Sequence, residues 1–164
     1  MGYTIAICDD DKAMADKLTA SLKNEFMKAG RNDVIIDYYD TGVQLLEALK
    51  NKMYKAVLLD INMEPMDGFA VAEAIGKSGY RTKIIFVTSH EDVVYDTFDY
   101  TPFYFIRKSR YETYVQRVVK KLIAIDGYEK TIVIDDKDGI ININSGDITY
   151  VHLSLIHISE PTRP

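Results

Sequence analysis

The chain has 164 residues, of which 47% are hydrophobic, enough to bury one core and part of a second module. The formal net charge of −5 and the pI near 5.2 argue against a chain-wide nucleic-acid or membrane-surface binder, because both partners are anionic. The single cysteine, Cys8, excludes an internal disulfide, and no apolar run approaches membrane-spanning length. We therefore expect a cytoplasmic protein that does not bind a membrane.

Short apolar runs alternate with helical patterns along the first three quarters of the chain. The runs that predict strands are residues 3–8, 34–39, 55–59, 83–87 and 103–106. This alternation predicts an α/β fold with a parallel sheet and crossover helices. Residues 56–59 and 84–87 are apolar at successive positions, so both faces of those strands should be covered.

Helical patterns fill the segments between the predicted strands. The first has apolar residues every four positions, followed by Gly30 as a helix end: Met14, Leu18, Leu22 and Phe26. The second begins at Thr41, with Gln44 three residues on in a capping-box pattern. Further helices are predicted near residues 67–76 and 91–100, the latter partly exposed. The last has an apolar stripe at Val115, Val118, Leu122 and Ile125.

Acidic residues follow two of the predicted strands. Asp9 and Asp10 come directly after the first strand, and Asp60 ends the third. The carboxyl ends of parallel strands meet at one edge of a sheet, so these side chains should converge. Converging carboxylates repel one another, and a hard divalent cation offsets that cost. We predict that Asp9 and Asp10 bind Mg²⁺, with the backbone carbonyl of Asn62 within reach.

The same edge of the sheet should carry a nucleophile and two groups that neutralise charge. Beside a bound cation, Asp60 can attack a phosphoryl group and form an acyl phosphate. Thr88 ends the fourth strand and Lys108 follows the fifth, where they can contact phosphoryl oxygens. An aspartate after a strand more often caps the next helix, the role we assign to Asp11. The joint occurrence at several strand ends favours the chemical interpretation.

These residues resemble the motifs of bacterial response-regulator receivers over about residues 1–125. The matching segments are Ile7–Asp11, Leu58–Met63, Met66–Gly68, Phe86–Thr88 and Lys108. The resemblance implies a flavodoxin-like, doubly wound, five-stranded parallel sheet. It also implies that a sensor histidine kinase phosphorylates Asp60, and that Mg²⁺ is held by Asp9, Asp10, Asp60 and the Asn62 backbone carbonyl.

The resemblance further implies a conformational switch. In such a switch the phosphoryl group draws the Thr88 hydroxyl inward and Phe105, three residues before the lysine, follows it. The surface of the fourth helix, fifth strand and fifth helix would then change, which makes a homodimer on phosphorylation an expectation. Two positions depart from the family pattern, because Glu64 and Ser109 stand where prolines are usual.

The sequence pattern changes after residue 125. Residues 126–129 are predicted to be a linker, and residues 130–152 resemble the first strands of a LytTR-type DNA-binding domain. The full-length protein would then bind promoter DNA and regulate transcription, whereas this fragment would not bind DNA specifically. Residues 153–164 do not continue that domain and resemble translated sequencing-adapter sequence, so we expect a non-native tail.

Three alternatives use a similar sheet. A phosphatase of the haloacid-dehalogenase type needs a second acid two residues after the nucleophile, and that position is Asn62. A flavodoxin-like cofactor binder needs a glycine- and hydroxyl-rich loop where this chain has three aspartates. A stand-alone receiver would differ only in the segment after Asp126. We therefore expect a phosphorylated regulator rather than an enzyme.

Overall fold

The computed structural model describes residues 2–89, 102–128, 131–136 and 139–144. The chain forms two compact units, residues 1–121 and 122–164. Within the described ranges, no helix is both long and apolar enough to cross a membrane. The helix predicted at 91–100, residues 145–152 of the segment that resembles a DNA-binding domain, and the tail at 153–164 lie outside the described residues.

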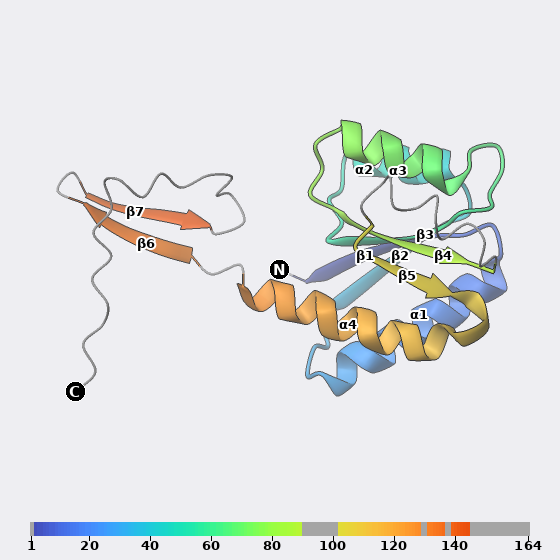
Figure 1. Cartoon of the computed structure of the whole chain (residues 1–164), viewed down its shortest axis with the longest axis horizontal. Coiled ribbons are helices and arrows are strands. Elements are labelled where there is room, and N and C mark those ends of the chain that lie inside the picture. The colour runs from blue at the N-terminus through green and yellow to red at the C-terminus, as the bar shows by residue number, and fades with distance from the viewer. Residues whose placement is uncertain (1, 90–101, 129–130, 137–138, 145–164) are drawn as a thin grey trace. The chain divides into compact units, whose positions relative to one another are not determined.

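The first unit is built on a five-stranded parallel sheet with strand order β2-β1-β3-β4-β5. Its strands are β1 (Tyr3–Cys8), β2 (Val34–Tyr39), β3 (Ala56–Asp60), β4 (Lys83–Thr88) and β5 (Tyr104–Arg107). Figure 1 shows α2 and α3 on one side of this sheet and α1 on the other. The predicted flavodoxin-like, doubly wound fold is confirmed.

The helices lie where the apolar spacing predicts them. Their bounds are α1 (Lys12–Lys28), α2 (Gly42–Leu49), α3 (Gly68–Lys77) and α4 (Tyr111–Tyr128), and a short 3-10 helix, η3 (Lys108–Arg110), precedes α4. The predicted stripe of α1 is buried, as are three of the four residues predicted for the last helix: Val115, Val118 and Leu122. Amphipathic spacing therefore identified the buried faces of both helices.

Local capping explains where the helices begin and end. Gly30 has a φ of 77° just after α1, and its N–H donates to the carbonyl of Met27 at 2.9 Å. Thr41 Oγ1 accepts the backbone N–H of Gln44 at 3.3 Å at the start of α2. Asp67 caps α3 by accepting the N–H of Ala70 at 2.8 Å. These caps agree with the predicted ends of the three helices.

A hydrophobic cluster includes residues of the sheet and of α2 and α3. It includes Ala6 and Cys8 from β1, Val57 and Leu59 from β3, and Phe86 from β4, together with Leu45, Leu49, Val71 and Ile75 from the two helices. All five residues of β3 are buried, as expected for a central strand covered on both faces. This packing fixes the strand ends that carry the acidic residues.

The second unit contains a two-stranded antiparallel pair. β6 (Thr131–Asp136) pairs with β7 (Gly139–Asn144), and Thr131 lies opposite Asn144. The described part of the segment that resembles the first strands of a LytTR-type domain therefore contains two strands. α4 continues to Tyr128, so residues 126–128 of the predicted linker are helical. The assignment of this unit to a DNA-binding domain stays a prediction.

Candidate functional site

Three aspartates meet at the carboxyl ends of β1 and β3. One carboxylate oxygen from each of Asp9, Asp10 and Asp60 lies within 4.8 Å of the other two. Asp9 and Asp60 are buried, whereas Asp10 is exposed. The neighbouring register of β1 and β3, with Cys8 opposite Leu59, brings these two strand ends side by side. We call these three residues the acidic cluster.

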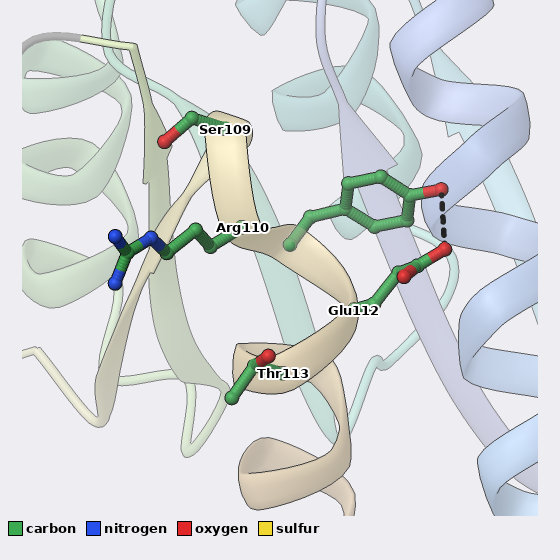
Figure 2. Close-up of a pocket in the computed structure, with 5 residues that line it drawn as sticks. Ser109, Arg110, Glu112 and Thr113 are labelled. Carbon is green, nitrogen blue, oxygen red and sulfur yellow. Dashed lines mark hydrogen bonds between the residues drawn. The ribbon is translucent and has the colours of Figure 1, made fainter.

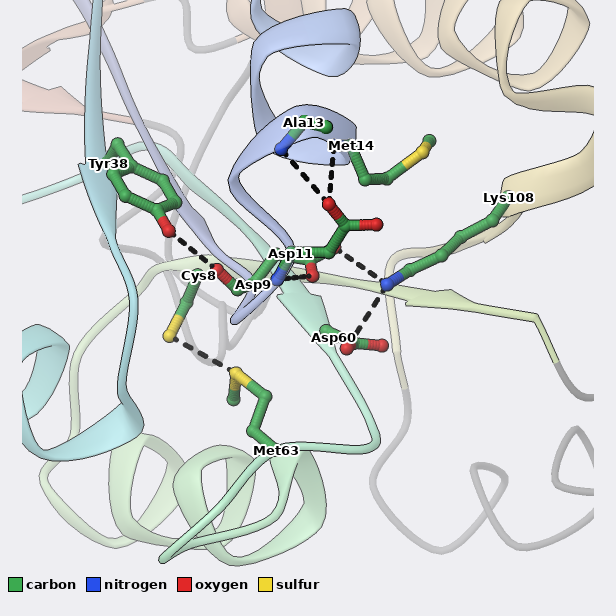
Figure 3. Close-up of polar contacts among 9 residues, drawn as sticks. All are labelled: Cys8, Asp9, Asp11, Ala13, Met14, Tyr38, Asp60, Met63 and Lys108. Carbon is green, nitrogen blue, oxygen red and sulfur yellow. Dashed lines mark hydrogen bonds and ion pairs between the residues drawn. The ribbon is translucent and has the colours of Figure 1, made fainter.

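Lys108 provides a positive charge to this cluster. It begins η3 directly after β5, and its side chain is 15% exposed. Its Nζ lies 2.8 Å from Asp9 Oδ2 and 3.1 Å from Asp60 Oδ2, as Figure 3 shows. Three carboxylates therefore face one ammonium, and the cluster has surplus negative charge when all are ionised.

The surplus negative charge of the cluster affects the pKa of Asp60. Burial, reinforced by the negative charge of Asp9, raises the pKa of the Asp60 carboxyl to about 6, although Lys108 opposes the shift. Burial alone would lower the pKa of Lys108, but its contacts with Asp9 and Asp60 hold that pKa above the ordinary lysine value. Lys108 stays charged at neutral pH, and Asp60 is less acidic than an ordinary aspartate.

The two oxygens of Asp9 differ in how they are satisfied. Oδ1 accepts the backbone N–H of Asp11 at 2.9 Å. Oδ2 is buried and accepts no well-aligned hydrogen bond, although Lys108 Nζ lies 2.8 Å away. Buried carboxylates are costly unless enough positive charge faces them, and the one ammonium of Lys108 is shared between Asp9 and Asp60. The donor set of two buried carboxylates and one exposed carboxylate therefore fits a hard divalent ion.

The other residues predicted for the site lie on neighbouring elements. Thr88 ends β4 and is 1% exposed, and the residue before it, Val87, pairs with Asp60 across the sheet. The backbone N–H of Asn62 donates to the Asp60 carboxylate and lowers its pKa slightly against the larger effect of burial. Phe105 lies on β5, half-buried against the hydrophobic cluster. Their chemical roles stay predictions.

Asp11 and Cys8 have structural roles beside the cluster. Asp11 Oδ1 accepts the backbone N–H groups of Ala13 and Met14 at 3.0 and 3.2 Å, which confirms its predicted role as the cap of α1. Cys8 is buried with its Sγ 3.6 Å from Met63 Sδ, and burial together with nearby aspartates raises its pKa to about 12. Cys8 is thus a neutral packing residue.

Two further residues support the site in ways that the sequence did not reveal. A Cβ atom on Gly68 would lie 2.3 Å from the backbone oxygen of Asp60, so only glycine fits against this strand end. The hydroxyl of Tyr38 donates to the backbone carbonyl of Asp9 at 3.0 Å. The position of Tyr38 near the end of β2, next to β1 in the sheet, is the only signal that could have indicated this contact.

A shallow pocket lies at the start of α4, just after Lys108. Its lining comes from five consecutive residues: Ser109, Arg110, Tyr111, Glu112 and Thr113. Figure 2 shows Ser109, Arg110, Glu112 and Thr113 around this pocket. The hydroxyl of Tyr111 donates to Glu112 Oε1 at 3.4 Å. None of the three clustered carboxylates lines this pocket. The chemistry of the site therefore belongs to the acidic cluster.

Comparisons with known sequences agree with this geometry. The transcriptional regulatory protein YpdB of Escherichia coli (strain K12) is 28% identical over 90 residues, which are 55% of this chain and 37% of that protein. Protein MrkE of Klebsiella pneumoniae is 27% identical over 88 residues, 54% of this chain and 33% of that protein. The match therefore covers about a third of the length of these curated relatives.

Solved structures share the fold. The response regulatory domain of mrkE from Klebsiella pneumoniae superposes with a TM-score of 0.66 at 22% identity, over 74% of this chain and 96% of that one. TrrA from Thermotoga maritima, solved in complex with Mg(2+)-BeF, gives a TM-score of 0.59 at 28% identity, over 73% and 98%. The sequence pattern of the response regulator receiver domain matches residues 5–120, more than half of the chain. This chain therefore belongs to the response regulator receiver domain family.

Proposed function

We propose that Asp60 accepts a phosphoryl group from a sensor histidine kinase. The observation that carries this proposal is the convergence of three carboxylates and one lysine at the strand ends, in a chain of the receiver family. Asp60 contacts Lys108 directly, and it lies close enough to Asp9 for the Asp9 charge to raise the pKa of Asp60. It is the residue best placed to act as a carboxylate nucleophile.

Mg²⁺ is the cation that this site is proposed to bind. Its ligands would be Asp9, Asp10, Asp60 and the backbone carbonyl of Asn62. The surplus negative charge of three converging carboxylates, two of them buried, supports this assignment. TrrA, whose structure contains Mg(2+)-BeF, supports it by similarity. The bound ion would neutralise negative charge on the transferred phosphoryl group.

The residues of the chain suggest how the transfer proceeds. A carboxylate oxygen of Asp60 attacks phosphorus, and a new O–P bond forms as the P–N bond to the kinase histidine breaks. The electron pair of that bond stays on the imidazole nitrogen of the kinase. Lys108, held 3.1 Å from Asp60 Oδ2, is placed to contact an oxygen of the new acyl phosphate. The product of this step is the phosphorylated chain itself and not a released molecule, so we expect a regulator rather than an enzyme.

A change in Thr88 and Phe105 is proposed to report phosphorylation to the surface. Thr88 is buried at the end of β4, next to the strand that carries Asp60. Phe105 lies opposite Phe86 on the next strand and is only half-buried, so its ring has room to move. Movement of the Thr88 hydroxyl toward a phosphoryl oxygen would open space for this ring. A homodimer on phosphorylation is the expected consequence and stays a prediction.

The output of the full-length protein is proposed to be transcriptional. The β6–β7 pair and the resemblance of residues 130–152 to a LytTR-type domain support a DNA-binding module after the receiver. YpdB, a relative over the receiver, is named a transcriptional regulatory protein. A mobility-shift assay with the full-length protein and promoter DNA tests this output. No shift of the DNA by the phosphorylated, folded protein would contradict it.

Intact-mass spectrometry after incubation with acetyl phosphate tests the proposed phosphoryl transfer. We expect one phosphoryl mass gain with Mg²⁺ and none with a chelator. Asp60→Asn should abolish the gain, because the amide is not a nucleophile. Asp40→Asn is a matched control, since it removes an exposed aspartate that lies near but outside the acidic cluster. A mass gain that persists in Asp60→Asn would reject Asp60 as the acceptor.

A further inference from the structure

Both backbone groups of Asp9, its N–H and its carbonyl, form hydrogen bonds with residues of the neighbouring strand β2. Its N–H donates to the carbonyl of Tyr39 at 3.1 Å, continuing the β1–β2 ladder past the end of β1. Its own carbonyl accepts the hydroxyl of Tyr38 at 3.0 Å, as Figure 3 shows. That carbonyl belongs to the peptide group that joins Asp9 to Asp10. A side chain of β2 therefore fixes the orientation of the peptide between two members of the acidic cluster.

The orientation of this peptide matters most for Asp10. Asp9 is buried and its carboxylate is fixed by Asp11 and Lys108, whereas Asp10 is exposed. No hydrogen bond or ion pair of the Asp10 side chain is found among the described residues, so its direction depends mainly on the backbone. A rotation of the preceding peptide would swing the Asp10 carboxylate away from the other two. The 4.8 Å convergence thus depends on this peptide.

The ring of Tyr38 is itself held in place. It is half-buried at the end of β2, and Lys12 Nζ lies 4.9 Å from the ring centroid. Lys12 is the first residue of α1, and its ammonium pairs with the carboxylate of Asp16 one helical turn later. The Lys12 ammonium therefore does not compete with a metal ion for the carboxylates of the acidic cluster. The hydroxyl is presented to Asp9 by a ring fixed between a strand and a helix.

We propose that Tyr38 is a positioning residue for the acidic cluster: its hydroxyl sets the Asp9–Asp10 peptide in the orientation that lets Asp10 share a divalent cation with Asp9 and Asp60. This inference rests on the proposed function, because it assumes that the cluster binds Mg²⁺. It adds a residue that contacts neither the ion nor the phosphoryl group. Tyr38 acts only through the backbone of Asp9.

The next residue on the same strand provides a matched control. Tyr39 points to the other face of β2, where its hydroxyl lies 2.5 Å from the hydroxyl of Tyr54. Tyr38→Phe and Tyr39→Phe each remove one hydrogen-bonded hydroxyl from adjacent positions of one strand. Both variants should lose some stability, but only the first removes a contact with the acidic cluster. A merely structural role for Tyr38 would make the two variants alike in cation affinity.

Titration calorimetry with Mg²⁺ on the unphosphorylated chain tests the inference. We expect Tyr38→Phe to weaken the affinity by about threefold to tenfold, the range for one net hydrogen bond, and Tyr39→Phe to leave it unchanged. Amide NMR spectra of the metal-free proteins should show shifts at Asp9 to Asp11 for Tyr38→Phe alone. These spectra also establish that each variant is folded before the titration is interpreted.

The outcomes separate this inference from the proposed function. Equal Mg²⁺ affinity in the wild type and Tyr38→Phe would overturn the positioning role while leaving the proposed function intact. Equal weakening in both tyrosine variants would also overturn it, because the effect would then arise from general loosening of β2. No Mg²⁺ binding by the wild type would reject the proposed cation site and this inference together.

Discussion

Two polar clusters of this molecule differ in how their charges are balanced. In the first, Asp37 on β2 accepts hydrogen bonds from Lys52 and from the Tyr54 hydroxyl, the latter at 2.5 Å. Although burial alone would raise the pKa of Asp37, these donors bring it below the ordinary value. The one carboxylate of this cluster is thus matched by one ammonium and one hydroxyl donor. We call Asp37, Lys52, Tyr54 and Tyr39, whose hydroxyl contacts that of Tyr54, the tyrosine cluster.

The acidic cluster has the opposite balance. Three carboxylates share one ammonium, one buried oxygen lacks a well-aligned donor, and the pKa of Asp60 is raised to about 6 by burial and by Asp9. A satisfied cluster stabilises the fold, whereas a cluster with surplus charge costs stability until something binds. The difference indicates that the acidic cluster binds a ligand, whereas the tyrosine cluster stabilises the fold. Substitutions in and around the two clusters test that contrast.

Lys108→Ala should have the largest effect on stability. It removes the ammonium that two buried carboxylates contact, which should lower the free energy of unfolding by about 3 kcal/mol at neutral pH. Added Mg²⁺ should restore part of the loss, because the cation binds only the folded cluster. Urea unfolding with and without Mg²⁺ measures both effects.

Lys50→Ala is the control for this variant. Lys50 pairs with Glu47 on the surface, where both side chains are about two thirds exposed, and its loss should change stability far less. If Lys108→Ala were no more harmful than Lys50→Ala, the acidic cluster would not depend on its ammonium. The contrast between the two clusters would then lose its electrostatic basis.

Gly68→Ala should lower the free energy of unfolding by about 2 kcal/mol, because the added methyl group collides with the backbone of Asp60 and Ile61. Displacement of this strand end should also slow phosphorylation by acetyl phosphate. Gly76→Ala, in the same helix α3, meets nothing within 4 Å and should stabilise the chain by up to about 1 kcal/mol. Equal effects in urea unfolding would show that Gly68 is not tightly packed.

Asp10→Asn should weaken Mg²⁺ binding at least about tenfold, because it removes a charged oxygen ligand from the cluster. Asp40→Asn changes the net charge equally at an exposed site and should have little effect on affinity. Titration calorimetry compares the two directly. Similar losses in both variants would mean that Mg²⁺ responds to the general negative field rather than to a site.

The smallest expected effects are opposite changes in the pH dependence of stability. The folded-state pKa of Asp60 is raised, so ionisation destabilises the fold as pH rises through about 6. With a chelator present, Asp60→Asn should therefore stabilise the chain at pH 8, and the gain should shrink toward pH 4. Asp9, Asp10 and Lys108 face Asp60, and the effects of Asp9 and Lys108 on the pKa of Asp60 partly offset each other.

Asp37→Asn should change the stability of the fold at neutral pH in the opposite direction to Asp60→Asn. The folded-state pKa of Asp37 is lowered, so its ionised form stabilises the fold above its ordinary pKa, and this stability is lost as pH falls through the folded-state value. The variant should be less stable than the wild type at neutral pH and converge with it in acid. Thermal melts across pH 3 to 8 would show whether the two aspartates differ in sign.

The strands and helices of the receiver were predictable because their apolar spacing is regular. Asp60 and Thr88 end their strands as predicted, whereas the fifth strand ends one residue later than predicted, at Arg107, because the sheet ladder continues past the last apolar residue. The ladder therefore holds Asp60 and Thr88 on rigid strand ends. Apolar patterns cannot reveal this, since the strand end is set by pairing with the neighbouring strand.

The residues of the acidic cluster were predictable from chain order alone, since parallel strands end at one edge. The contacts of Tyr38 and Gly68 were not, because they depend on how far a side chain reaches and how closely two backbones approach. Lys108 was expected near the cluster, but its contact with Asp9 as well as Asp60 required the geometry of η3.

The most direct test of the central claim is to locate the phosphoryl group among the three clustered carboxylates. After reaction with acetyl phosphate and Mg²⁺, borohydride reduction converts an aspartyl phosphate into homoserine, which tandem mass spectrometry can place in the sequence. The account predicts homoserine at position 60 alone. Homoserine at position 9 or 10, or anywhere outside the cluster, would contradict the assignment of Asp60 as the acceptor.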